Sequence, residues 1–343
     1  MPVSSLVRAD ARRLGANGPQ IGPLALGLWR FTGDDVDRNT ALIETALDLG
    51  MNLIDIADVY GLDWGGSGFG SCEDNLGALL RARPALRDRM VLATKGGIAP
   101  PLPYDSGAAA LRSACEASLT RLGTDHVDLY QVHRPDMFTH PAELADTLDG
   151  LIADGLAGAV GVSNYTPAQT RALATHLDAP LVSTQPEYSA ACLDPLRDGT
   201  LDLCAETGMV PLAWSPLAGG RLMAQRPLAG GRLTAQCQHL DEPPAAPSGN
   251  DGPDGPVGDP VDKPDGSVRD GLLATLDRLA ERESVDRAAV CVAFVLAHPT
   301  APIAIVGTQQ PERLVALQAA LTVRLDRNDL YDIIEASEGR PLP

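Results

Sequence analysis

The chain has 343 residues, of which 27 are Lys or Arg and 45 are Asp or Glu, so its formal net charge is -18. A surface of this sign repels phosphate backbones and anionic membranes, which argues against nucleic acid and membranes as partners. Residues 1–15 lack a long apolar core, and the most apolar later run, residues 288–307, is interrupted by two prolines. The sequence therefore predicts a soluble, cytoplasmic protein, long enough for one large α/β barrel, with no indication of its oligomeric state.

From residue 23 onward, short apolar runs alternate with amphipathic stretches. The apolar runs are residues 23–29, 52–56, 90–95, 127–133, 158–164, 181–185, 210–215 and 303–307. The helical stretches between them include residues 37–50, 72–84, 109–123, 141–155, 166–177 and 286–299. This alternation is typical of βα units around a parallel sheet. Eight such units favour a closed (β/α)₈ TIM barrel over an open doubly wound sheet, since no G-x-G-x-x-G follows the first run.

One segment departs from the barrel pattern. Residues 243–267 are so rich in Pro, Gly and Asp that they cannot form a packed core. Just before them, residues 216–225 (PLAGGRLMAQ) are followed by a near copy at residues 227–236 (PLAGGRLTAQ). The sequence thus predicts a local duplication and a flexible insertion over about 227–267, after the seventh strand of a single-domain barrel.

Chemistry-bearing residues close three consecutive apolar runs. Asp55, Lys95 and His133 stand at or near the ends of the second, third and fourth runs, and Tyr60 follows in the loop after the second. A parallel barrel brings such strand ends to one mouth. We expect Lys95 to pair with Asp55 and to lower the pKa of Tyr60, which would then serve as general acid to a carbonyl oriented by His133. Taken singly, each of these residues is more often structural.

Three motifs carry a resemblance to the aldo-keto reductase superfamily. These are DIADVYG (residues 55–61), LATKGG (92–97) and DLYQVHRPD (128–136). Residues 25–33 and 198–222 are similar to a bacterial branch of general oxidoreductases, and the resemblance extends over about residues 12–336. It implies NAD(P)H-dependent interconversion of a small-molecule carbonyl and an alcohol, with the tetrad Asp55, Tyr60, Lys95 and His133 as catalytic residues and no metal.

The same resemblance implies cofactor contacts. The nicotinamide end is assigned to Ser163, Asn164, Gln185 and Trp214, the pyrophosphate to Ser215, Leu217 and Gly219, and the adenosine phosphate to Thr308 and Arg313. Many family members have a lysine where Gly307 stands, so we expect a modest preference for NADP(H), with NAD(H) as the alternative. The glycine-rich loop around Trp64 lacks the Lys-Ser/Thr of a P-loop and is interpreted as a rim of the substrate pocket. Trp29 is the other predicted pocket residue.

A second function from a different class is compatible with the barrel. The chain would then be a catalytically weak regulatory protein that binds a nicotinamide cofactor and reports redox state to a partner. The intact tetrad favours the enzyme.

Overall fold

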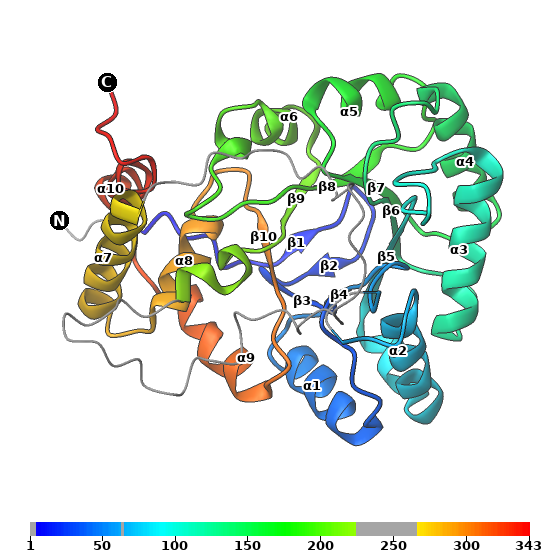
Figure 1. Ribbon diagram of the computed structural model, residues 1–343, viewed down its shortest axis with the longest axis horizontal. Helices are drawn as coiled ribbons and strands as arrows, with labels where there is room; N and C mark the ends of the chain where they lie inside the picture. The colour runs from blue at the N-terminus through cyan, green and yellow to red at the C-terminus, as the bar shows by residue number, and fades with distance from the viewer. Residues whose placement is uncertain (1–4, 63–64, 224–265) are drawn as a thin grey trace, which may run out of the picture.

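Eight short parallel strands close into a barrel at the centre of the molecule (Figure 1). The computed structural model describes residues 5–62, 65–223 and 266–343. The barrel strands are β3 (Leu24–Gly27), β4 (Leu53–Asp55), β5 (Val91–Gly96), β6 (Leu129–Val132), β7 (Val160–Ser163), β8 (Leu181–Gln185), β9 (Val210–Ala213) and β10 (Ile303–Val306). Each pairs with the next along the chain, and β10 closes the barrel against β3. The predicted fold class and all eight predicted strands are confirmed.

Helices surround the barrel, as the same view shows. They are α1 (Val36–Asp48), α2 (Ser71–Ala82), α3 (Ala108–Leu122), α4 (Pro141–Ala153), α5 (Pro167–Ala174), α6 (Thr200–Thr207), α7 (Gly266–Glu283), α8 (Arg287–Leu296), α9 (Pro311–Leu317) and α10 (Arg327–Glu338), with short 3-10 helices at Pro84–Arg89, Asp194–Leu196, Ala218–Met223 and Gln318–Leu321. Local signals explain several helix starts. Asp35, for example, caps α1 by accepting hydrogen bonds from the amides of Asp37 and Arg38.

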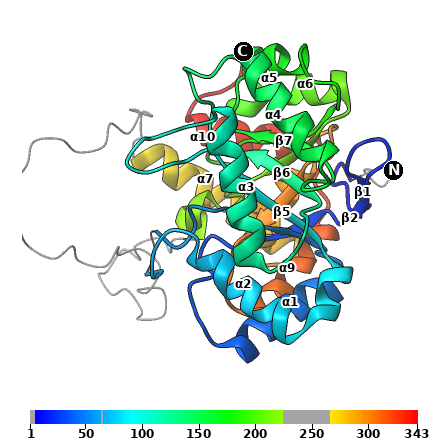
Figure 2. The same ribbon diagram turned by 90° about the vertical axis from the view of Figure 1, so that its right-hand side faces the viewer.

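A small hairpin that the sequence did not predict lies across one end of the barrel (Figure 2). It pairs β1 (Arg12–Arg13) with β2 (Gln20–Ile21) in antiparallel fashion. Leu14 and Ile21 are fully buried in one hydrophobic cluster with Leu53 and Val91, the first residues of β4 and β5. The hairpin therefore plugs the end at which the strands begin, and leaves the opposite end as the mouth.

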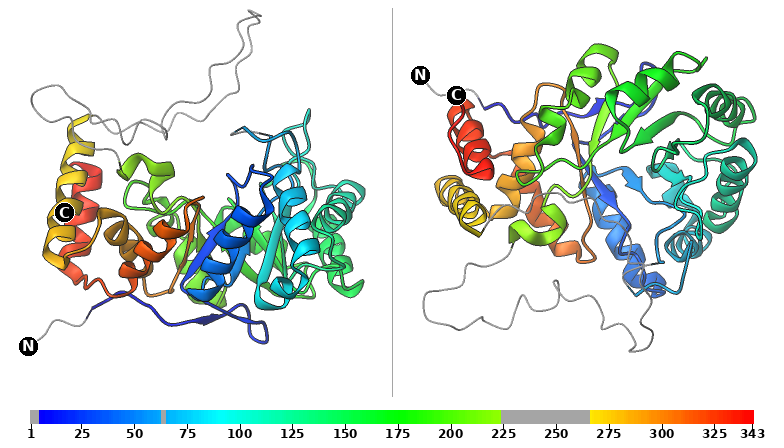
Figure 3. Two further views of the ribbon diagram at one scale, coloured as in Figure 1. Left: turned by 90° about the horizontal axis from the view of Figure 1, so that it is seen from below. Right: turned by 45° about the horizontal axis from the view of Figure 1, so that its top comes forward.

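Helices α7 and α10 pack side by side outside the ring of helices (Figure 3). Two ion pairs join them, between Arg278 and Asp332 at 2.7 Å and between Arg282 and Asp329 at 2.6 Å. Neither helix was among the stretches predicted from the sequence. The predicted insertion does fall after β9, the seventh barrel strand, but it lies outside the described residues except for its last two, which begin α7.

The interior of the barrel changes from apolar to polar along the strands. Alternate residues of a strand point to the same face, so Leu53 and Asp55 both point inward, as do Ala93 and Lys95. The first residue of each pair belongs to the buried cluster beneath the mouth, and the second is polar and also buried. This ordering places charged groups at the mouth, on a packed apolar base.

In the described part of the chain, no helix has the length and apolar character needed to cross a membrane.

Candidate active site

Lys95 connects the predicted catalytic residues. Its Nζ atom donates to Asp55 Oδ2 at 2.7 Å, to the carbonyl oxygen of Ile56 at 2.8 Å and to the hydroxyl oxygen of Tyr60 at 3.1 Å. These three acceptors match the three N–H donors of an ammonium group. The side chain of Lys95 is completely buried and that of Asp55 is 4% exposed. A buried lysine whose three donors are all used is held in one orientation, with its charge aimed at the tyrosine hydroxyl.

The turn that carries Tyr60 depends on the glycine after it. Gly61 has φ +101°, a left-handed conformation that side chains rarely adopt. A Cβ atom there would also lie 1.9 Å from the Oγ atom of Ser71, at the start of α2. The amide of Cys72 donates to the Tyr60 carbonyl at 3.3 Å, which ties the turn to the same helix. The Tyr-Gly pair of the motif is thus required by the backbone, and the tyrosine hydroxyl is free to face inward.

Burial determines the protonation state of Tyr60. Removal from water raises its pKa above the usual 10, and the nearby charge of Lys95 only partly opposes this increase. The lowered pKa predicted for Tyr60 is wrong, because burial outweighs the effect of the neighbouring cation. For Lys95, burial acts to lower the pKa, but the charge of Asp55 outweighs it, so the pKa is raised. At neutral pH the site therefore holds a protonated tyrosine beside a charged lysine.

His133 lies beside Tyr60 as a neutral imidazole. The two ring centroids are 5.8 Å apart and the rings are nearly perpendicular, with an interplanar angle of 79°. Burial, together with the charges of Lys95 and Arg134, holds the pKa of His133 well below its usual 6.5. Its Nδ1 atom is buried and has no hydrogen-bond partner among the described residues. The residue as a whole is only half-buried, so the ring is available to a neutral polar ligand at the mouth.

Two glutamines complete the surroundings of Asp55. The side-chain amide of Gln185 donates to Asp55 Oδ1 at 2.8 Å, and that of Gln131 approaches the same oxygen at 3.4 Å. Gln185 was predicted as a cofactor contact, whereas the structure places its amide against the tetrad. Gln131 was not predicted at all. Its signal was present, since it lies two residues before His133 and therefore on the same face of β6.

A second polar chain runs along the mouth from β7 to β9. Asn164 donates to Ser163 Oγ at 2.9 Å and to the His133 carbonyl at 3.1 Å, and its Oδ1 accepts from Trp214 Nε1 at 3.1 Å. Ser163 Oγ in turn donates to the Gln185 carbonyl at 2.9 Å. All four predicted nicotinamide contacts are thus linked, Gln185 through its carbonyl, and Trp214 is fixed in orientation while it stays half-buried.

Beyond Trp214, the backbone turns sharply. Ser215, Ala218, Gly219 and Gly220 all have positive φ, from 51° to 98°. No atom lies within 4 Å of a Cβ built on Gly219, so open space borders the turn there. Leu217 is half-buried in the same turn.

The predicted adenosine-end residues follow β10. Thr308 is half-buried and its Oγ1 accepts from the Gln310 amide at 3.2 Å, just before α9. Arg313 is exposed on the first turn of α9. Gly307 is exposed too, and a Cβ built on it would meet only the Gly27 carbonyl oxygen, at an ordinary 3.6 Å.

Of the two predicted pocket tryptophans, the structure describes only Trp29. Trp29 follows β3 at the mouth and is 38% exposed, with the Arg30 guanidinium 5.7 Å from its ring centroid. Trp64 lies outside the described residues, so its assignment remains a prediction.

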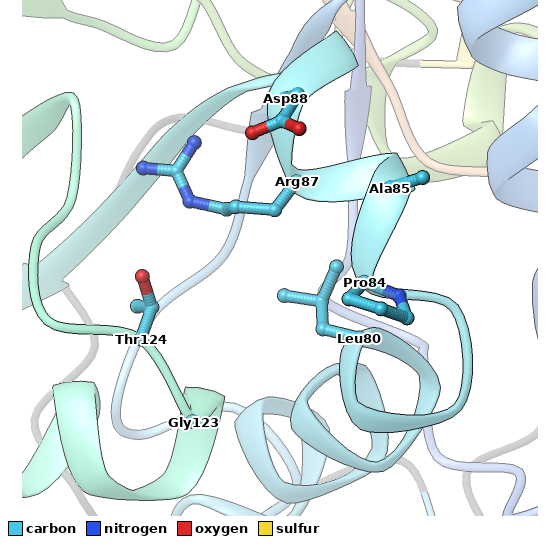
Figure 4. Close-up of a pocket in the computed structure, with 7 residues that line it drawn as sticks. All are labelled: Leu80, Pro84, Ala85, Arg87, Asp88, Gly123 and Thr124. Atoms are coloured by element: carbon cyan, nitrogen blue, oxygen red, sulfur yellow. The ribbon is translucent and has the colours of Figure 1, made fainter.

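A hollow of about 400 Å³ lies elsewhere, on the outside of the barrel (Figure 4). Its lining residues are Leu80, Pro84, Ala85, Arg87, Asp88, Gly123 and Thr124. They come from the ends of α2 and α3 and the segments that lead into β5 and β6, which places the hollow toward the end of the barrel opposite the mouth. In the described part of the chain, no cluster of three or more His, Cys, Asp or Glu residues could hold a metal ion.

The fold and the mouth together define a class of protein. It is a (β/α)₈ barrel with Asp55, Lys95 and His133 at the ends of neighbouring strands and a loop tyrosine that accepts a hydrogen bond from the lysine. The sequence profile of the Aldo/keto reductase family matches residues 23–338, and the chain belongs to this family. The family predicted from the three motifs is thereby confirmed. As a member, the chain is an oxidoreductase of small-molecule carbonyl or alcohol substrates, in a family that uses nicotinamide cofactors.

Two curated proteins and one solved structure are similar to this chain over nearly its whole length. The 6-dehydroglucose reductase of Novosphingobium aromaticivorans is 40% identical over 335 residues, which are 97% of either chain. The 6-dehydroglucose reductase of Agrobacterium fabrum is 32% identical, over 94% of this chain and 96% of its own. Among solved structures, the glycerol dehydrogenase of Gluconobacter oxydans superposes with a TM-score of 0.77 at 26% identity, covering 98% of both chains.

Proposed function

We propose that this chain, acting as one domain, is an NADPH-dependent reductase that converts the carbonyl group of a small sugar derivative to an alcohol. The observation that carries the proposal is the position of Lys95, which donates to both Asp55 and Tyr60 from a buried site. A lysine with only a structural role would not need its charge directed at a tyrosine hydroxyl that faces the mouth.

Tyr60 is the proposed general acid. Its raised pKa keeps the hydroxyl protonated at neutral pH, so the proton is present when a carbonyl oxygen accepts negative charge. The phenolate that forms on proton transfer would lie 3.1 Å from the Lys95 ammonium. Because Lys95 is already balanced by Asp55, it can stabilise this new charge without leaving a bare cation in the resting site. Proton transfer by a positioned group typically contributes about 10²–10⁴-fold to a rate.

His133 is the proposed orienting group. A neutral imidazole can donate one N–H to a carbonyl oxygen without adding charge to the site. The T-shaped contact with Tyr60 keeps the two donors on neighbouring sides of one space. A carbonyl oxygen bound between them would accept from both, and this fixes which face of the carbonyl carbon is open to attack.

The residues at the mouth fit a dinucleotide cofactor. The half-buried ring of Trp214, held by Asn164, offers a fixed surface for a planar ring. The open space beside Gly219 and the left-handed turn at residues 218–220 permit close approach of a pyrophosphate to the backbone. Arg313 supplies a cation for a 2′-phosphate, which supports NADPH over NADH. When bound, the reduced nicotinamide supplies the hydride.

The proposed substrate class follows from the two relatives named as 6-dehydroglucose reductases. Such a sugar has a carbonyl group in place of one hydroxyl. The mouth also carries charged groups. Arg134 follows His133, and Glu187 lies 4.0 Å from Arg221. These groups are suited to bind sugar hydroxyls. Reduction is the proposed direction because a protonated Tyr60 is ready to donate.

A substrate panel tests this function. Purified protein is mixed with NADPH or NADH and a set of aldehydes, ketones and dehydro sugars, and loss of the reduced-nicotinamide absorbance is followed. We expect turnover on dehydro sugars, faster than on simple alkyl aldehydes of similar size. A chain that binds NADPH but turns over none of these compounds, in either direction, would contradict the proposal.

A further inference from the structure

Behind Lys95, on the outer side of β5, lies a second group of buried charges. Glu73 on α2 is completely buried, and its Oε2 forms an ion pair with Arg121 on α3 at 2.7 Å. Its Oε1 accepts from Thr94 Oγ1, the residue that precedes Lys95. Arg121 also donates to Ser118 Oγ at 3.2 Å. One carboxylate and one guanidinium are therefore paired in this space, and both oxygens of the carboxylate accept hydrogen bonds.

Asp58 adds a second carboxyl group to the same space. It is 1% exposed, and its Oδ1 atom has no hydrogen-bond partner within the described ranges. The charged groups that act on it are Glu73 from α2, Arg121 from α3 and Lys95 from β5, and the backbone amide of Val59 favours its ionised form. Tyr130 on β6 and Cys115 on α3 complete the titratable surroundings. Lys95 is already paired with Asp55 and Arg121 with Glu73, so no described cation remains to balance an ionised Asp58.

The surroundings therefore hold Asp58 as a neutral acid. Burial, followed by the charge of Glu73, raises its pKa to about 8. Above that value the site would contain two buried carboxylates and one shared guanidinium, an arrangement whose desolvation is not compensated.

Asp58 and Tyr60 belong to one turn, and both ends of this turn are attached to Lys95. The Asp58 amide donates to the Lys95 carbonyl at 3.1 Å, and the Tyr60 hydroxyl accepts from Lys95 Nζ at 3.1 Å. Between them, the Tyr60 amide donates to the Ala57 carbonyl at 3.2 Å. A shift of Asp58 out of its buried position would therefore move the hydroxyl of Tyr60 away from the ammonium.

We propose that Asp58 is a positioning residue for Tyr60, which holds the turn of residues 57–60 against Lys95 while its carboxyl group is uncharged and releases the turn when the group ionises. The link to catalysis rests on the role of Tyr60 in the proposed function. The effect of Asp58 on the position of the turn does not depend on the proposed function, and it can be measured without turnover.

The first measurement is amide hydrogen exchange at about pH 7 and about pH 9, on either side of the raised pKa of about 8, with each rate divided by its intrinsic value. In the parent protein we expect protection of the Asp58 amide to fall about tenfold or more at the higher pH, which corresponds to about 1.4 kcal/mol. Asp58→Asn, which cannot ionise, should keep its protection. The Ala304 amide, which donates to the Pro23 carbonyl at 3.1 Å where the neighbouring strands β10 and β3 pair, is the internal control.

The second measurement is turnover in both directions over the same pH range, each protein normalised to its own rate near neutral pH. If Tyr60 loses its position, the rates of reduction and of oxidation should both fall in the parent above about pH 8. The proton consumed or released by the reaction itself changes these two rates in opposite senses. Asp58→Asn should not show this shared loss. Asp74→Asn, an exposed carboxylate one residue after Glu73, is the matched control and should follow the parent.

Constant protection of the Asp58 amide in the parent from about pH 7 to about pH 9 would overturn the proposal, as would an equal loss in Asp58→Asn. Should the variant fail to fold, the parent exchange data decide alone. Absence of turnover at every pH would count against the proposed function, and the exchange of the Asp58 and Tyr60 amides would still decide whether Asp58 holds the turn.

Discussion

The Nζ atom of Lys95 lies 3.1 Å from the hydroxyl oxygen of Tyr60, although the two residues come from successive βα units. The contact exists because parallel strands end at the same face of the barrel and because Gly61 permits the turn after β4 to fold back. It makes the lysine, and through it Asp55, part of the environment of the proposed acid.

Removal of Lys95 should affect stability and turnover separately. Lys95→Met leaves Asp55 as a buried carboxylate without its cation, and we expect a loss of about 3–5 kcal/mol of unfolding free energy. The double variant Asp55→Asn/Lys95→Met should recover most of this stability, because both charges are gone. Its turnover should stay low, since no cation stabilises the Tyr60 phenolate. Urea unfolding and steady-state rates of the three proteins test this, and a double variant with near-parent turnover would show that the pair is only structural.

His133 should make the protein less stable in acid. Its folded-state pKa lies below the ordinary 6.5, so the unfolded chain binds more protons at mildly acidic pH. The stability associated with His133 is therefore fully present above about pH 6.5 and is lost as the pH falls toward the lowered pKa. His133→Gln should weaken the dependence of the melting temperature on pH in this range, and the exposed His176→Gln should not. Equal slopes in all three proteins would refute a buried, neutral His133.

Much of this architecture could be predicted from the sequence because its causes are local. The barrel strands appear as short apolar runs, and Asp55, Lys95 and His133 stand at or beside their ends. The sign of the Tyr60 pKa shift could not be predicted, since it depends on how completely side chains from other βα units exclude water. The buried cluster of Glu73, Arg121 and Asp58 also depends on tertiary packing, whereas Gln131 could have been found from its place two residues before His133.

Arg313 should set the choice of cofactor. Arg313 is exposed at the start of α9, so an ion pair with the 2′-phosphate would be worth about 1 kcal/mol. Arg313→Ala should therefore weaken NADPH binding by several-fold and leave NADH binding nearly unchanged. Gly307→Lys should strengthen the preference for NADPH, because a side chain at this position has room. Titration of both cofactors into the three proteins is the measurement. Equal loss of affinity for both cofactors in Arg313→Ala would show that this arginine does not bind the 2′-phosphate.

The first of the two duplicated segments should be the one that lines the cofactor. Gly219 has φ +66° with open space beside it, so Gly219→Val would strain the backbone and fill that space, and cofactor affinity should fall. Deletion of residues 227–237, which lie outside the described residues, should change affinity and turnover little, because the first segment supplies the cofactor contacts. It should also change stability little, because chain length between fixed ends affects closure entropy only weakly. The reverse pattern would mean that the second segment supplies the site.

The central claim is that the hydroxyl of Tyr60 donates the proton, and Tyr60→Phe tests it most directly. The substitution keeps the ring and removes the hydroxyl that accepts from Lys95. Binding of NADPH and the reductive turnover of a good dehydro-sugar or aldehyde substrate are measured side by side in parent and variant. The account predicts unchanged cofactor affinity with turnover lower by about two orders of magnitude or more, and a variant that reduces the same substrate at a near-parent rate would contradict it.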